Sequence, residues 1–407
     1  GVDTAIVSDI GGTTTDIAIL DQGKPRIDPQ GATVGGYRTM VDAVAMRTFG
    51  LGGDSEVHVA EGGLRPEIGL GPRRLVPLSL LAHLNGPDVT RALERQARQA
   101  LPVRNEGRFA LHAGVPERLS AGLSRSEADL FSRLTDTPQP LDRLLKSTAE
   151  LATLNRLAAR GLALVAGFTP SDAQHVLGRF THWDVAAAKL GATLLARRKD
   201  GYGNPLAPDA ETISVRVVER LVRLSAERVL ETALCEDGLD GAALAGSALA
   251  QRALDRETGV ARMALSLDRP VIALGAGAAA CYRQVGELLA TDAVVPAHAD
   301  VANAVGAVVG QVRVAVTAEI AQPVEGRFEI TGLAGAAGLV FKSADEALAE
   351  AERRCRAAAQ ALAADAGAAE VSVSASRAVN TATIEGQEQF VSATVTATAG
   401  GRPATAG

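Results

Sequence analysis

The stretch at residues 6–20, IVSDIGGTTTDIAIL, constrains the fold more than any other part of the chain. Two apolar segments flank an aspartate, two glycines and three threonines, and each segment has the length and composition of a β-strand. A hairpin reverses with only two turn residues, so this run of small polar residues exceeds what a turn requires. The pattern predicts adjacent strands within residues 5–20, joined by a loop whose composition needs a further explanation.

The loop has the chemistry of an anion-binding site. Gly11 and Gly12 let the backbone approach an oxyanion closely, because no Cβ intervenes. Backbone N–H groups and the hydroxyls of Thr13 and Thr14 can donate hydrogen bonds to phosphate oxygens. Asp9, just before the glycines, can hold hydrated Mg²⁺, since hard cations prefer oxygen ligands. The alternative is a glycine hairpin with a chance aspartate, which suits an isolated Gly-Gly turn better than this octapeptide.

Composition excludes several classes of function. The chain has 407 residues, enough for two or three domains, and its 47% apolar and 22% charged residues are ordinary for a soluble globular protein. The net charge of −6 and the 3% of aromatic residues argue against nucleic-acid binding as the main role. No apolar run has the length of a membrane span. The three cysteines, Cys235, Cys281 and Cys355, lie far apart, with neither a metal-ligand spacing nor the even count of a disulfide framework, which favours a reducing, cytoplasmic location.

Several motifs, taken in order, resemble the A-subunit type of the hydantoinase/oxoprolinase family, within the actin, sugar kinase and DnaK-type ATPase superfamily. They are DIGGTTTDIAIL, TFGLGGDSEV, GFTPSDAQHVLGR, VIALGAGA, VVPAHADVANAVGAVVG and, near the C-terminus, TATAGGRP. The resemblance implies that ATP and Mg²⁺ are used to phosphorylate the carbonyl of a cyclic amide, such as a hydantoin or 5-oxoproline, for hydrolysis. It leaves two alternatives open: a carboxylase subunit acting on a ketone, and a reactivating factor or chaperone of the same superfamily.

One departure from the family pattern bears on completeness. The family carries a D-x-G-G-T motif twice, whereas this sequence has it once and in surroundings that resemble the second occurrence. We therefore expect a first lobe, with its own phosphate loop, to lie upstream of Gly1, so that this chain is a fragment of the enzyme. The resemblance also implies a B-type subunit as partner, besides the cyclic amide substrate, and implies neither nucleic acid nor membrane.

The expected fold is α/β: an actin/sugar-kinase-like ATPase lobe with a helical insertion and a small C-terminal α/β unit. Its expected parts are residues 1–83 with the phosphate loop, 84–160 as the helical insertion, 161–315 with an adenosine-type motif, and 316–407 as the C-terminal unit. Within the insertion, Ser124 and Glu127 have the spacing of a capping box. Residues 124–166 also have a winged-helix outline, but their scattered cations favour a structural insertion over DNA binding. Residues 293–316 predict a strand, a loop and a helix rich in Gly and Ala.

Two further glycine segments are implicated by the resemblance. In GLGGDSE, residues 50–56, Gly52 and Gly53 are expected to face the phosphates, and Asp54 is the weaker candidate. In LGAGA, the triplet Gly275, Ala276 and Gly277 matches the position of the superfamily's adenosine contact. Close packing of a strand against a helix explains that triplet equally well.

The remaining candidates are polar residues whose roles the sequence leaves open. Asp9 and Asp172 are the candidate catalytic residues, and Asp9 and Asp16 the candidate Mg²⁺ ligands. Asp16 is the weaker ligand, because it begins the returning strand and can simply bond the loop. Asp172 and His175 lie three residues apart at an expected helix start, where they could position a substrate or transfer a proton. Alternatively Asp172 caps that helix, and capping is the favoured role of Ser171.

Overall fold

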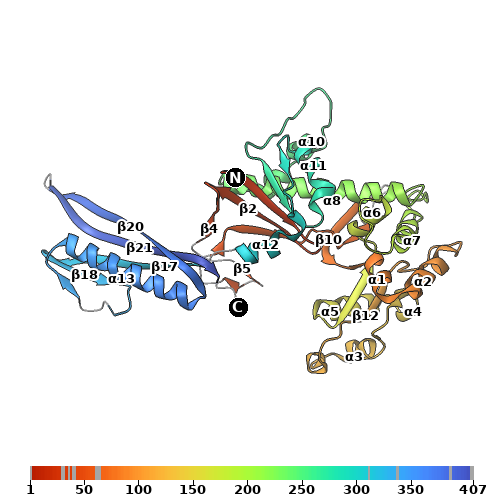
Figure 1. The fold of residues 1–407 in the computed structure, drawn as a ribbon. Helices are drawn as coiled ribbons and strands as arrows, with labels where there is room; N and C mark the ends of the chain where they lie inside the picture. Colours follow the sequence, from red (N-terminus) through yellow and green to blue (C-terminus); the bar gives the residue numbers. More distant parts are fainter. Residues whose placement is uncertain are drawn as a thin grey trace. The chain divides into compact units, whose positions relative to one another are not determined.

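The computed structural model describes residues 2–28, 33–34, 37–38, 43–59, 66–309, 312–335, 339–384 and 387–403. The chain divides into two compact units, Gly1–Val301 and Ala302–Gly407 (Figure 1). Among the described residues, no helix is both long and apolar enough to cross a membrane.

A mixed β-sheet forms the centre of the first unit. Its order is β16-β15-β1-β2-β3, and β8 also pairs with β2. The hairpin of β1 and β2 is antiparallel, whereas β15 and β16 run parallel to β1 on its other side. The α/β fold predicted from the sequence is confirmed. The strands are β1 (Ala5–Ile10), β2 (Thr15–Asp21), β3 (Lys24–Pro25), β8 (Met46–Phe49), β15 (Val271–Leu274) and β16 (Ala293–Val294).

Alternation along the hairpin separates a buried face from a more open one. Ile6 and Ile10 of β1 and Ile17 and Ile19 of β2 are buried, and they contribute to one hydrophobic core with side chains of α8 (Ala210–Glu236) and α11 (Ala278–Leu288). Side chains of successive strand residues point to opposite faces, so Asp9 lies on the other face, where it is half-buried. Burial of each isoleucine contributes about 1.5–3 kcal/mol, so α8 and α11 secure the sheet from one side.

The long helix α8 begins at a well-defined cap. The Asp209 side chain accepts a hydrogen bond from the backbone N–H of Thr212, and Gly238 follows the end of the helix with φ of 79°. Val217, Leu221 and Val229 are among its buried residues, at the spacing of one helix face. The other helices of this part of the unit are α6 (Pro170–Val176), α7 (Val185–Ala196), α9 (Gly241–Ala245) and α10 (Ala248–Leu254).

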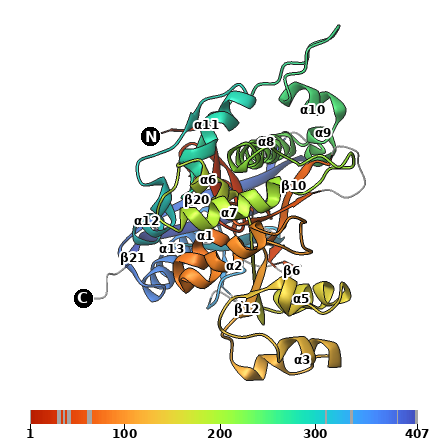
Figure 2. The same ribbon diagram turned by 90° about the vertical axis from the view of Figure 1, so that its right-hand side faces the viewer.

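A second sheet, in the order β11-β14-β12-β13, takes two of its strands, β12 and β13, from the stretch that the sequence assigns to a helical insertion. The capping box predicted at Ser124 and Glu127 is confirmed at the start of α3. The helical insertion predicted over residues 84–160 also contains the short strands β12 and β13, which pair with each other, and β12 pairs with β14. Figure 2 shows β12 in the same part of the molecule as α3 and α5. The elements are β11 (Val76–Pro77), α1 (Leu78–Asn85), α2 (Pro87–Ala97), β12 (Phe109–His112), η1 (Glu117–Ser120), α3 (Arg125–Phe131), β13 (Gln139–Pro140), α4 (Leu141–Leu144), α5 (Ala149–Ala159) and β14 (Ala163–Gly167).

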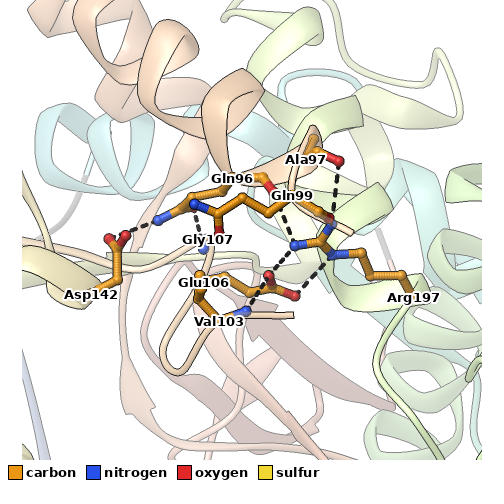
Figure 3. Close-up of polar contacts among 8 residues, drawn as sticks. All are labelled: Gln96, Ala97, Gln99, Val103, Glu106, Gly107, Asp142 and Arg197. Atoms are coloured by element: carbon orange, nitrogen blue, oxygen red, sulfur yellow. Dashed lines mark hydrogen bonds and ion pairs between the residues drawn. The ribbon is translucent and has the colours of Figure 1, made fainter. Parts of the chain in front are cut away.

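Arg197, just past the end of α7, ties α2 to the loop that follows it (Figure 3). Its guanidinium donates hydrogen bonds to the carbonyl oxygens of Gln96 (3.0 Å), Ala97 (3.2 Å) and Gln99 (2.8 Å), at the end of α2. It also pairs with the carboxylate of Glu106, which is nearly fully buried. The last carbonyls of a helix have no partner within the helix, so Arg197 supplies them with donors.

The second unit is an antiparallel sheet covered on one face by a single helix, α13 (Figure 1). Residues Ala347, Ala351, Cys355, Ala359 and Ala363 form a buried stripe at spacing four along α13, which lets the helix lie close to the sheet. The helix predicted at the end of residues 293–316 stops at Val309, and β17 begins at Val312, so that expectation is wrong for the VRVAV segment. The elements are α12 (Ala302–Val309), β17 (Val312–Val324), β18 (Arg327–Thr331), β19 (Val340–Phe341), α13 (Ala344–Asp365), β20 (Ala368–Ile384) and β21 (Gln387–Pro403).

The remaining described elements are short. They are β4 (Ile27–Asp28), β5 (Thr33–Val34), β6 (Tyr37–Arg38), β7 (Ala43–Val44), β9 (Ser55–Val59), β10 (Ile68–Arg74) and η2 (Ala299–Val301). Among them β9 and β10 form an antiparallel hairpin, and this hairpin carries the second glycine segment at its beginning.

Candidate functional site

The loop between β1 and β2 closes on itself and presents small groups to solvent. The backbone N–H of Gly11 donates to the carbonyl of Thr14 over 2.9 Å. Gly11, Gly12 and Thr13 are exposed, and Thr14 is half-buried. A Cβ on Gly11 would come no closer than 3.4 Å to the Thr14 oxygen, so the fold leaves room for a side chain there. In the described structure the N–H groups of Gly12 and Thr13 and the Thr13 hydroxyl have no hydrogen-bond partner, so the loop offers donors at the carboxyl end of β1.

The second glycine segment packs directly on this loop. The N–H groups of Gly53 and Asp54 donate to the carbonyls of Gly11 (3.0 Å) and Gly12 (2.7 Å). A Cβ on Gly52 would lie 2.5 Å from both of those carbonyl oxygens, closer than real Cβ atoms come. Glycine at position 52 is therefore required for the two backbones to meet. The structure thus brings together two motifs that the sequence places about forty residues apart.

The third glycine motif follows β15, which lies on the opposite side of β1 from β2. Leu274 is the register partner of Asp9 in the parallel pair of β15 and β1. Gly275 has φ of 95°, and a Cβ there would lie 2.2 Å from the Ile10 carbonyl oxygen and 3.0 Å from Asp9 Oδ1. Gly277 has room for a side chain, since its nearest neighbour would be 3.9 Å away, and Ala276 is exposed. Close backbone approach thus explains Gly275, but not Gly277.

Two aspartates lie next to each other on the more open face of the hairpin. Asp9 and Asp16 are register partners, which places their Cβ atoms about 5 Å apart on one face of the sheet. Asp16 accepts hydrogen bonds from the hydroxyls of Thr48 (2.5 Å) and Thr14 (3.4 Å). Within the described part of the chain, the Asp9 carboxylate has neither a hydrogen bond nor an ion pair. Asp9 is therefore a half-buried carboxylate with its acceptor capacity unused.

The described residues contain no group of three or more His, Cys, Asp or Glu side chains that could enclose a metal ion. Asp9, with Asp16 beside it, nevertheless has the donor chemistry that Mg²⁺ needs when its remaining ligands are water and phosphate. The residues present fit an ion held together with a nucleotide, and do not fit a cage made by protein alone.

Asp54 is the weaker candidate in its segment by sequence, but its carboxylate contacts three separate segments of the structure. It is 7% exposed, and a Cβ on Gly12 would lie 2.5 Å from its Oδ2 atom. The same Oδ2 atom accepts hydrogen bonds from Arg74 Nε (3.3 Å) and Nη2 (3.1 Å), while Oδ1 accepts from the Ser171 hydroxyl (3.2 Å). Arg74 is not apparent as a site residue from the sequence, because no local pattern around residue 74 indicates its partner. Its contact depends on the pairing of β9 with β10.

Asp172 lies behind this site and is fully buried. Its Oδ2 accepts from the N–H groups of Leu78 and Thr169 (both 3.0 Å) and from the Thr169 hydroxyl, and its Oδ1 accepts from the N–H and hydroxyl of Ser79 (2.8 and 2.6 Å). Burial raises the pKa of Asp172 to about 6, although these hydrogen bonds act in the opposite direction. These contacts favour a capping role for Asp172. The catalytic role of Asp172 stays a prediction.

The cap of α6 is Thr169, and not Ser171 as the sequence suggests. The side chain of Ser171 instead faces Asp54. His175 does not hydrogen-bond Asp172: its Nδ1 lies 2.8 Å from the Ser171 carbonyl oxygen, and its ring stacks on Trp183 with centroids 5.2 Å apart. Burial lowers the pKa of His175, which favours the neutral ring. The predicted Asp172–His175 pair is therefore not brought together as a hydrogen-bonded unit.

A large cavity of about 1410 Å³ lies elsewhere in the first unit. It is lined mainly by residues of α8, including Arg216, Arg220, Arg223 and Arg228, and by parts of α10 and α11. None of the candidate site residues lines it. The glycine site and this cavity are therefore separate features.

Comparisons with known proteins find similarities of the N-terminal part and, more distantly, of the whole chain. Two solved structures are similar at a TM-score of 0.39: a nucleotide-free acetone carboxylase from a study of ATP-dependent acetone carboxylation (14% identity, 99% of this chain and 47% of that one) and an ATP-dependent caprolactamase from Pseudomonas jessenii (13%, 98% and 46%). This chain thus spans about half the length of either protein. No curated protein matches it. Residues 1–103 match the hydantoinase/oxoprolinase family model, in agreement with the resemblance of the motifs that lie in this range.

Proposed function

We propose that this chain supplies the phosphate-binding lobe of an ATP-dependent enzyme that activates the carbonyl of a cyclic amide, hydantoin or 5-oxoproline-like, by phosphorylation. The observation that carries the proposal is the Asp9 carboxylate, which has no partner in the described structure and stands beside a loop of free donors. The family match over residues 1–103 supports it, because that range contains both the loop and the segment that packs on it.

Each of the three glycine motifs would have a different role in binding the nucleotide. The N–H group of Gly12 and the hydroxyl of Thr13 would donate to the phosphates, and the Thr14 hydroxyl would join them by leaving Asp16. Gly11, whose own N–H is bonded to Thr14, would let the backbone approach the phosphates closely. Gly52 and Gly53 would hold that loop in shape. The Gly275–Gly277 turn, at the start of α11, would approach the adenosine side. Asp9, assisted by Asp16, would hold Mg²⁺ through water.

Phosphoryl transfer needs positioning and charge neutralisation more than covalent chemistry by the protein. Mg²⁺, when bound, supplies part of that neutralisation. In the proposed reaction the carbonyl oxygen attacks the γ-phosphorus, the bond between the γ-phosphorus and the bridging oxygen of ADP breaks, and ADP leaves. Water then attacks the phosphorylated carbonyl carbon, the C–N bond of the ring breaks, the ring nitrogen takes up a proton, and inorganic phosphate leaves. In this scheme Asp172 acts structurally, by joining the N-termini of α1 and α6 behind the site.

The complete reaction is proposed to need more polypeptide than this chain. The chain spans 47% and 46% of the two proteins compared above, and the family resemblance implies a B-type subunit. We propose that such a subunit, or a further lobe, contributes the part of the substrate pocket that the glycine site lacks.

The direct test is MgATP binding by the chain and by Gly11→Ala. Because the fold leaves room for a Cβ at residue 11, the variant should unfold like the wild type, yet the methyl group should block the approach of phosphate. We expect MgATP affinity to fall at least tenfold by isothermal titration calorimetry. Gly306→Ala is the matched control, since a Cβ there also meets open space and lies in the second unit. Wild-type affinity in Gly11→Ala, or no MgATP binding by the wild type, would contradict the proposal.

A further inference from the structure

The ion pair between Asp54 and Arg74 lies directly against the glycine loop. Arg74 donates to Asp54 Oδ2, and that same oxygen is the atom that a Cβ on Gly12 would meet at 2.5 Å. The carboxylate thus stands between the loop and the guanidinium. It places a cation next to the backbone that we propose to bind phosphate.

Arg74 retains most of its capacity to bind a ligand. Its side chain is 58% exposed, whereas that of Asp54 is only 9% exposed. A guanidinium carries five N–H donors, and Asp54 engages two of the nitrogens through a single oxygen. In the described structure Arg74 has no other hydrogen-bond or ion-pair partner. The remaining donors face solvent on an anchored side chain.

The three glycine motifs carry only negative side-chain charges, so binding of an anionic nucleotide there requires a cation from another segment. Residues 9–16, 50–56 and 274–278, which form the three glycine motifs, contain no lysine or arginine. They do contain Asp9, Asp16, Asp54 and Glu56, so the loops alone would repel a nucleotide's terminal phosphates. Arg74 lies outside these segments, on β10, and binds Asp54, which packs against Gly12 of the loop. The planar guanidinium also matches phosphate oxygens in a bidentate manner.

We infer that Arg74 binds a terminal phosphate of the nucleotide, and that Asp54 is a positioning residue that holds Arg74 beside the loop. This inference rests on the proposed function, since it assigns one more contact to the same nucleotide. Neither residue takes a proton or forms a bond in this role. Arg74 contributes charge and hydrogen-bond donors, and Asp54 contributes their placement.

The chain offers a matched control in the neighbouring residue. Arg73 is also on β10, its side chain is 50% exposed, and it pairs with Glu56 Oε2 over 2.6 Å. Successive strand residues point to opposite faces, so the two arginines diverge. Glu56 is held in turn by Arg108, at 2.7 Å, and not by the glycine loop. Arg73 and Arg74 are therefore both half-exposed arginines that are paired with a buried carboxylate. They differ in that the partner of Arg74 contacts the glycine loop and the partner of Arg73 does not.

The test compares MgATP binding by calorimetry in the wild type, Arg74→Ala, Arg74→Lys and Arg73→Ala. We expect Arg74→Ala to weaken MgATP binding at least tenfold and AMP binding less than twofold, because AMP lacks the terminal phosphates. Arg74→Lys should fall between, since it keeps the charge and loses the fork, and Arg73→Ala should stay within twofold of wild type. Equal losses in Arg73→Ala and Arg74→Ala, or none in Arg74→Ala, would overturn the inference while wild-type binding preserves the proposed function. If the wild type binds no MgATP, both fail.

The positioning role of Asp54 is tested by combining variants. Asp54→Asn should weaken MgATP binding in the wild-type background but add little in the Arg74→Ala background, because its effect acts through Arg74. A purely structural role would give the same loss in both backgrounds and would refute the assignment. Fluorescence of Trp183, the single tryptophan, monitors whether each variant keeps the first unit folded, and Arg74→Lys replaces Arg74→Ala if the latter does not.

Discussion

Substitution of Gly52 by alanine tests whether the two glycine segments truly meet as described. The new Cβ would lie 2.5 Å from the carbonyl oxygens of Gly11 and Gly12. Since real Cβ atoms stay beyond about 3.0 Å, one backbone has to move, and overpacking of this kind costs about 1–3 kcal/mol. The shift also strains the hydrogen bonds from Gly53 and Asp54 to the same carbonyls, each worth about 1 kcal/mol.

A smaller effect opposes these losses. Alanine restricts the unfolded chain more than glycine does, which stabilises the variant by about 0.4–1 kcal/mol. The net expectation for Gly52→Ala is a loss of about 3 kcal/mol in the free energy of unfolding. For a domain of this size, a loss of that order lowers the melting temperature by about 6–12 °C.

The assay is urea and thermal unfolding followed by the fluorescence of Trp183. Because Trp183 is the single tryptophan and lies in the first unit, the signal reports on the unit that contains the site. Gly11→Ala is the control, since its Cβ would be no closer than 3.4 Å to any atom, and it should stay within about 1 kcal/mol of wild type. A loss below about 0.5 kcal/mol in Gly52→Ala, or an equal loss in Gly11→Ala, would refute the described contact.

Three further predictions concern other parts of the first unit. Arg197→Ala should lower the free energy of unfolding by about 3–5 kcal/mol in urea titrations, because it leaves the buried Glu106 unpaired, and a smaller loss than in Arg98→Ala, whose pair is exposed, would contradict this. Asp172 has a folded-state pKa of about 6 against an ordinary 3.8, so its stabilising contribution is complete below pH 3.8 and is lost as the pH rises through 6. Relative to Asp172→Asn, the wild type should therefore lose up to about 3 kcal/mol between pH 4 and 7, and a constant difference would exclude this titration. In the complete enzyme, Asp9→Ala should reduce ATP turnover with 5-oxoproline or a hydantoin at least a hundredfold, with unchanged unfolding, and retained turnover would remove Asp9 from the site.

The features that the sequence predicted well are local. The β1–β2 hairpin follows from two apolar runs and the composition of the loop between them, and the capping box at Ser124 follows from a spacing of three residues. Gly52 and Gly275 were tied to the phosphate loop only through the family resemblance. Their contacts with Gly11 and Ile10 depend on backbone geometry that no spacing reports.

The features that the sequence missed are those decided by tertiary pairing. The segment VRVAV in β17 alternates with period two, but the preceding Gly- and Ala-rich helix hid the change to strand. Ser171 has the composition of a cap, and yet Thr169 takes that position because Asp172 completes its capping box. Arg74 became a candidate only once β9 and β10 placed it next to Asp54.

The pairing of β1 with β15 has a consequence for how the protein is made. β1 begins at Ala5 and its parallel neighbour at Val271, so nearly the whole first unit is synthesised before one edge of β1 finds its partner. At ordinary rates of translation this delay is on the order of tens of seconds. During that time the apolar hairpin presents unpaired backbone groups, which other chains could bind. The site at the end of β1 is thus completed late, and a nascent chain that stalls before β15 would be prone to aggregate.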